Sequence, residues 1–195
     1  MPRLTPYLRD EDFIRDKIPM TKEEVRHISV CKLGLTEDAV VYDVGAGTGS
    51  IAVEIANLST EIQVFAIETA PEAVSLIRKN VEKFGLFNVE VVEAIAPEGL
   101  EALPVPSHAF IGGSKGNLKA ILDTLYAKNP QMRIVMNAVS LEAIVQMQQA
   151  LSFFQVKDLD ITQMSVSKAK ELGDYHLMMA NNPVYIYAFT FDGGK

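Results

Sequence analysis

A glycine-rich turn carries the strongest chemical signal in the chain. The apolar run 40–44 contains Asp43 and leads directly into three glycines at alternate positions. A second apolar run, 63–67, is followed by Glu68, 19 positions after the last of these glycines. Glycine permits positive φ and lets a ligand approach the backbone closely. The pattern predicts a nucleotide-type cofactor site beside the turn, which consists of Gly45, Ala46, Gly47, Thr48 and Gly49.

The spacing of the glycines discriminates between cofactors. A dinucleotide site has the pattern G-x-G-x-x-G, whereas this chain has G-x-G-x-G with Ser50 in place of the last glycine. S-adenosylmethionine has no phosphate and needs a carboxylate for its ribose hydroxyls. Glu68 can accept both hydroxyl protons, and Asp43 is placed to meet the methionine ammonium. We therefore favour S-adenosylmethionine over NAD; the alternative is a tight turn without a ligand, with Glu68 as a solvated strand end.

Composition limits the class of protein. The chain has 195 residues, is 48% hydrophobic and carries a net charge of −7. We expect one domain over residues 1–195 with a short extension over about 1–20, no membrane span and no signal peptide. The acidic balance disfavours nucleic acid as a partner. The single cysteine, Cys31, fits a reducing cytoplasm, and three scattered histidines give no reason to expect a metal site.

Strand and helix patterns alternate along most of the chain. Strands are expected at 40–44, 63–67, 89–92, 109–111 and 133–136, with helices at 50–58, 117–127 and 141–151. Two further helices are expected to start at capping boxes, one at Thr21 that stops at Gly34 and one at Thr69 that stops at Gly85. The runs 154–167 and 184–191 predict a terminal antiparallel pair that flanks a polar segment. The predicted fold class is α/β, with a mostly parallel sheet.

Several segments together resemble a known family. They are Ile-Pro-Met-Thr-Lys-x-Glu-Val-Arg at 18–26, Asp-x-Gly-Ala-Gly-Thr-Gly-Ser at 43–50, Ala-Ile-Glu at 66–68, Val-Glu-Ala-Ile-Ala-Pro-Glu at 92–98, Phe-Ile-Gly-Gly-Ser at 110–114 and Asn-x-Pro-Val at 181–184. The chain resembles the Rossmann-like class I S-adenosylmethionine-dependent methyltransferases, which have a seven-stranded sheet. Within that class it resembles the cobalt-precorrin methylases of cobalamin biosynthesis that methylate carbon 15 and decarboxylate.

The resemblance implies roles for individual residues. The glycine turn would hold the methionine end of the cofactor and Glu68 the ribose. Many relatives have an acid where this chain has Ile95, so recognition of adenine would rest on backbone groups and apolar packing, or on Glu93. The remaining cofactor residues would be Thr21, Thr69, Ala94, Ile95 and Ala96. The substrate residues would be Pro19, Met20 and Lys22 in a lid, with Gly112, Gly113, Ser114, Lys115 and Asn137; for the lysines the alternative is a solvated side chain.

The implied reaction converts cobalt-precorrin-6B to cobalt-precorrin-7 and removes the C-12 acetate carboxyl group. No general acid or base is singled out by the sequence. The resemblance also suggests a homo-oligomer, a dimer or a tetramer. Two alternatives remain: a class I methyltransferase that acts on RNA or protein, and a non-catalytic subunit that binds S-adenosylmethionine.

Overall fold

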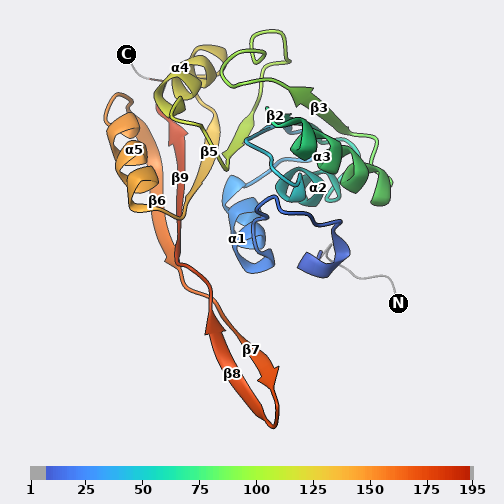
Figure 1. Ribbon diagram of the computed structural model, residues 1–195. Coiled ribbons are helices and arrows are strands. Elements are labelled where there is room, and N and C mark those ends of the chain that lie inside the picture. Colours follow the sequence, from blue (N-terminus) through green and yellow to red (C-terminus); the bar gives the residue numbers. More distant parts are fainter. Residues whose placement is uncertain (1–7, 194–195) are drawn as a thin grey trace.

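A seven-stranded sheet forms the centre of the computed structural model, which describes residues 8–193 (Figure 1). Its strand order is β3-β2-β1-β4-β5-β9-β6, with the first five in parallel and β9 antiparallel to both of its neighbours. The predicted fold class, a mostly parallel sheet with a terminal antiparallel pair, is confirmed. The strands are β1 (Val40–Val44), β2 (Gln63–Glu68), β3 (Val89–Glu93), β4 (His108–Ile111), β5 (Arg133–Ala138), β6 (Val156–Met164) and β9 (Val184–Phe191).

Helices cover both faces of this sheet, because successive strand residues point to opposite sides. In β1, Val41 packs into a core with α1 to α3, and the adjacent Tyr42 packs into a second core with α4 and α5. Strands buried on both faces explain why their sequences read as continuous apolar runs. The helices are α1 (Glu23–Leu33), α2 (Ser50–Ala56), α3 (Pro71–Lys83), α4 (Leu118–Lys128) and α5 (Leu141–Leu151), preceded by the 3-10 turn η1 (Asp10–Asp12).

The two predicted capping boxes are wrong, although both predicted helix ends are confirmed. Helix α1 begins at Glu23 and α3 at Pro71, and neither has a side-chain cap. Proline at the first position of α3 already has the helical φ and no N–H to satisfy. Gly34 and Gly85 follow the two helices with φ of +63°. Thr21 and Thr69 therefore lie ahead of their helices and are available to other contacts.

The polar segment between the last two sheet strands forms a β-hairpin that the sequence did not predict. Strands β7 (Ser167–Leu172) and β8 (Tyr175–Ala180) pair with each other, away from the main sheet. The hairpin projects from the body of the protein (Figure 1), and all of its strand residues are exposed. A strand with no buried face has no alternation of apolar and polar residues to reveal it.

The strand order reverses between β1 and β4, and a parallel sheet binds ligands at such a point, beyond the carboxyl ends of its strands. The loops after these two strands are in very close contact. A Cβ on Gly45 would lie 2.6 Å from the carbonyl oxygen of Gly113, and Gly45 has φ of +71°. Only glycine therefore allows the two loops to close over this edge of the sheet.

Alanine substitutions separate the two reasons for glycine here, the positive φ and the close approach of another backbone. Gly85 has φ of +63° but open space around it, so Gly85→Ala should lower the free energy of unfolding by about 1–2 kcal/mol, the cost of left-handed backbone. Gly45→Ala adds a clash with backbone atoms and should cost about 2–5 kcal/mol. Chemical denaturation of both variants measures the difference. If both variants lose the same free energy of unfolding, the loops after β1 and β4 can move apart without cost.

Candidate functional site

Two cavities lie at the carboxyl ends of β1, β2 and β4. The larger has a volume of about 690 Å³ and the smaller about 120 Å³. Gly45, Glu68 and Lys115 line both of them, so the two cavities lie next to each other. The larger volume is within the usual range for sites that hold small molecules. The two together, the cleft of this site, lie where the reversal in strand order predicts a ligand.

The larger cavity is enclosed by the glycine turn, the segment before α1 and the base of the hairpin. Gly49, which directly precedes α2, does not line this cavity. It faces α3 instead, where a Cβ on Gly49 would lie 2.9 Å from the Ile77 side chain. Val139, Met164, Val166 and Asn182 also line this cavity and were not predicted as site residues. Asn182 lies within the 181–184 segment that carries part of the family resemblance. The predicted site residues that line this cavity are Pro19, Met20, Thr21, Lys22, Asp43, Gly45, Ala46, Gly47, Thr48, Glu68, Gly112, Lys115 and Asn137.

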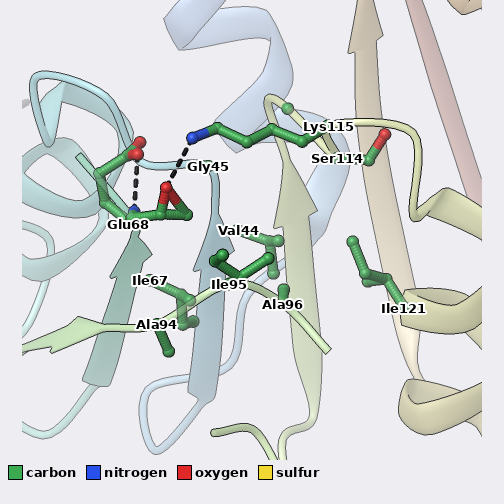
Figure 2. A pocket seen from close by; sticks show the side chains of 12 residues that line it. Val44, Gly45, Ile67, Glu68, Ala94, Ile95, Ala96, Ser114, Lys115 and Ile121 are labelled. Carbon is green, nitrogen blue, oxygen red and sulfur yellow. Dashed lines mark hydrogen bonds between the residues drawn. The ribbon is translucent and has the colours of Figure 1, made fainter. Parts of the chain in front are cut away.

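The smaller cavity is apolar at one end and polar at the other (Figure 2). Glu93, the residue suggested as a substitute for the acid that relatives have at position 95, lines neither cavity. Gly113 and Ser114, predicted as substrate residues, lie here and not in the larger cavity. An apolar cleft of this kind suits a flat ring held by packing. Its apolar residues are Val44, Ile67, Ala94, Ile95, Ala96 and Ile121, and its polar residues include Glu68, Thr69, Ser114 and Lys115.

Glu68 holds the loops of the site together. Only 8% of the residue is exposed, so it is not a solvated strand end. One carboxylate oxygen accepts from the N–H of Gly47 at 3.0 Å. The other accepts from the N–H groups of Thr69 at 2.7 Å and Ala70 at 3.1 Å. The carboxylate thus links the glycine turn to the loop after β2, and it lines both cavities from there.

Asp43 and Thr48 present polar atoms that lack a partner among the described residues. Asp43 is fully buried, and its Oδ2 accepts from the N–H of Ala52 at 3.0 Å. Its Oδ1 and the hydroxyl of Thr48 have no hydrogen bond, and both residues line the larger cavity. Burial raises the pKa of Asp43 to about 7, the Ala52 hydrogen bond opposes this, and Glu68 adds to it. Buried polar atoms are normally paired, so these two fit the ammonium and carboxylate of an amino-acid ligand.

Lys115 and Asn137 both have partners within the protein. Lys115 has φ of +47°, and its ammonium donates to Thr69 Oγ1 at 2.5 Å across the cleft (Figure 2). The side-chain amide of Asn137 donates to Ser29 Oγ on α1 at 3.0 Å. Lys115 is exposed and could exchange its partner for a ligand. Asn137 lines the larger cavity while its amide is held by α1.

Residues 8–193 lack the side-chain clusters and the helices that two other kinds of site would need. No three histidine, cysteine, aspartate or glutamate side chains in this range come together as a metal site would require. Within the same range, no helix has both the length and the apolar character that crossing a membrane demands.

Comparison with known proteins gives one consistent result. A sequence profile of the precorrin methyltransferase domain matches residues 11–191. The chain is 39% identical over 188 residues to a "probable cobalt-precorrin-6B C(15)-methyltransferase (decarboxylating)" of Pyrobaculum calidifontis, covering 95% of this chain and 96% of the relative. It is 34% identical over 183 residues to the cobalt-precorrin-6B C(15)-methyltransferase (decarboxylating) of Salmonella typhimurium, covering 93% and 94%.

Solved structures agree with the sequence matches. The precorrin-6Y C5,15-methyltransferase of Geobacter metallireducens superposes with a TM-score of 0.88 at 36% identity, over 96% of this chain and all of the other. A SAM-dependent O-methyltransferase of Thermotoga maritima, 15% identical with a TM-score of 0.73 over 88% of this chain and 66% of its own, shares the fold. The turn, the cleft and these matches lead to one conclusion: the chain belongs to the precorrin methyltransferase family.

Proposed function

We propose that this protein is an S-adenosylmethionine-dependent methyltransferase that converts cobalt-precorrin-6B to cobalt-precorrin-7. The observation that carries the proposal is the pairing of the two cavities. The smaller is narrow and apolar enough for an adenine ring, and the larger continues past it under the segment before α1. A donor and a bulkier acceptor can therefore bind next to each other. The names of the relatives, 34–39% identical over nearly the whole chain, supply the substrate.

The cofactor residues divide by the part of the molecule that they would contact. Asp43 and Thr48 have unpaired buried atoms that suit the methionine end. Glu68 keeps one acceptor position for a ribose hydroxyl, since a carboxylate offers about four lone-pair positions and three are used by backbone N–H groups. Ala94 to Ala96 would contact adenine by packing and through the backbone. Thr21, Thr69 and the glycine turn would complete this site.

The chemistry places modest demands on the protein. S-adenosylmethionine, when bound, supplies an electrophilic methyl group on a sulfonium. That methyl group would go to carbon 15, and the conjugated ring of the substrate would take up the electron pair that the acetate leaves behind when it loses carbon dioxide. Protein residues need to align the reacting atoms and exclude water. Pro19 and Met20 cover the cleft, Gly112 allows close approach, and Lys22 and Lys115 can meet substrate carboxylates.

The two rival functions find less support. A methyltransferase for RNA would need a basic surface, whereas the net charge is −7. A binding subunit without activity would not need the larger cavity to extend beyond the glycine turn to the segment before α1 and the base of the hairpin. We place the reaction in the cytoplasm, where Cys31 can persist as the exposed free thiol that it is here.

We further propose a homo-oligomer in which a second copy of the chain covers the β7–β8 hairpin. A lone two-stranded hairpin is marginally stable in water, and this one has exposed apolar side chains on both strands. Such patches on monomers usually mark interfaces. Because one chain offers the same hairpin to its copy, a symmetric dimer or tetramer follows. The side chains concerned are Leu172, Tyr175, Leu177, Met178 and Met179, each 46–73% exposed.

The pKa of Asp43 predicts how cofactor affinity depends on pH. An ionised Asp43 attracts the ammonium, so affinity should fall about tenfold per pH unit below pH about 7. The stability of the unligated protein should change with pH in the opposite direction. Between its ordinary value of 3.8 and about 7, the folded state holds a proton that the unfolded chain has lost, so stability falls as pH rises.

Calorimetry measures cofactor affinity and chemical denaturation measures stability, both between pH 4 and 8. In the Asp43→Asn variant neither quantity should depend on pH in this way. The amide oxygen of asparagine can still accept from Ala52, so the variant is expected to fold. Affinity that is flat between pH 5 and 8 in the unsubstituted protein would eliminate Asp43 from the ammonium site.

The reaction itself is tested by mass. Incubation with cobalt-precorrin-6B and S-adenosylmethionine should give a product that has gained one methyl group and lost one carbon dioxide, with no change when S-adenosylmethionine is left out. Gain of the methyl group alone would reduce the proposal to methylation without decarboxylation. If the mass of the substrate does not change, whether or not the ring contains cobalt, the proposed function is wrong.

The oligomer is tested by sedimentation at micromolar concentration. The unsubstituted chain should sediment as a dimer or tetramer, and replacing residues 167–180 with two glycines should give the monomer. Phe87→Asp is a matched control, because Phe87 is fully exposed on another loop, and it should leave the assembly intact. A monomer mass for the unsubstituted chain would refute the interface.

A further inference from the structure

The N-terminal strap, residues 8–22, covers part of the larger cavity and is held by buried side chains from outside it. Its last part, Ile18 to Lys22, lines the cavity. A Cβ on Gly47 in the glycine turn would lie 3.4 Å from the carbonyl oxygen of Pro19 and 3.8 Å from the Ile18 side chain. The strap therefore lies directly on the turn that would receive the cofactor.

Arg26 of α1 is the first anchor. Its side chain is fully buried and forms an ion pair with Glu54 of α2 at 2.9 Å. The rest of the guanidinium binds the strap: Asp10 Oδ1 at 3.2 Å, the Thr21 carbonyl at 2.8 Å and the Leu8 carbonyl at 2.6 Å. A planar guanidinium can meet all of these acceptors at once, whereas an ammonium cannot.

This arrangement makes the strap difficult to lift. Without the strap, Arg26 would keep Glu54 and lose its contacts with Leu8, Asp10 and Thr21. A buried charge that loses its partners is strongly destabilising. The guanidinium also lies 4.7 Å from the ring centre of Phe13, which is itself in the strap and buried. The strap thus completes the environment of a charge that belongs to the core.

Asn80 of α3 is the second anchor, and it is also fully buried. Its side-chain oxygen accepts from the N–H of Ile14 at 2.8 Å, and its amide donates back to the Ile14 carbonyl at 3.2 Å. The same amide donates to the carbonyl of Thr48 in the glycine turn at 2.9 Å. One side chain therefore ties the strap and the glycine turn to each other.

We propose that Arg26 and Asn80 are positioning residues for the cofactor. They fix the strap on both sides of residues 15–17, so that Ile18 to Lys22 forms a preformed roof over the glycine turn. Neither side chain lines either cavity, so Arg26 acts through the strap, and Asn80 acts through the strap and the glycine turn. A preformed roof removes the need to order this segment when the ligand binds, and that raises affinity. The inference rests on the proposed function, which places the cofactor at this turn.

The test uses Arg26→Lys and Asn80→Ala with two readouts on the full chain. Both variants should bind S-adenosylhomocysteine about tenfold more weakly or worse by calorimetry, through loss of the preformed roof. Trypsin should also cut faster after Arg15 and Lys17, which are exposed between the anchors. Asp10→Ala, on the strap itself, repeats the test with the Arg26–Glu54 pair still in place if either variant folds poorly.

Asn88→Ala is the matched control. Asn88 donates to the carbonyls of Ala56, Ser59 and Ile62 at the opposite edge of the sheet, so its loss should lower stability without changing affinity or cleavage after Lys17. If the unsubstituted protein fails to bind S-adenosylhomocysteine, the proposed function fails. If it binds, and Arg26→Lys, Asn80→Ala and Asp10→Ala bind equally well with unchanged cleavage, the positioning role is refuted and the function stands.

Discussion

The site depends above all on one carboxylate that is buried against backbone N–H groups. Glu68 accepts from Gly47 on one side and from Thr69 and Ala70 on the other. The glycine turn and the loop after β2 come from separate strands, and neither has regular structure to hold it in place. A charged acceptor shared between them makes bonds stronger than neutral ones. The shape of both cavities follows from this link, because Glu68 lines each of them.

A second constraint is steric, and it brings the third loop into place. Gly45 approaches the backbone of Gly113 so closely that no side chain fits on Gly45. The loop after β4 therefore closes on the glycine turn and carries Lys115 across to Thr69. Bonding by Glu68 and contact at Gly45 act on the same turn from opposite sides. Together they place the turn before any ligand arrives.

Much of this could be predicted from the sequence, for physical reasons. Buried strands such as Val40–Val44 are continuous apolar runs, and helix ends such as Gly34 need a special backbone, so both leave local signals. The capping boxes were wrongly predicted because Thr21 and Thr69 match a local pattern, whereas α1 and α3 begin two residues later, at Glu23 and Pro71, without a side-chain cap. The hairpin has no buried face to give a pattern. The anchoring by Asn80 was not predictable, since its partner Ile14 is 66 positions away.

The first turn of α1 connects the strap to the hairpin. One oxygen of Glu23 accepts from the N–H of Asp10 at 2.9 Å, and the other binds Lys168 of β7 at 2.6 Å. Glu24 pairs with the same lysine at 2.8 Å. The hairpin and the strap over the cleft therefore bind the same side chain of α1. Exposed ion pairs are weak and screened by salt, so this link between the hairpin and the strap loosens as ionic strength rises.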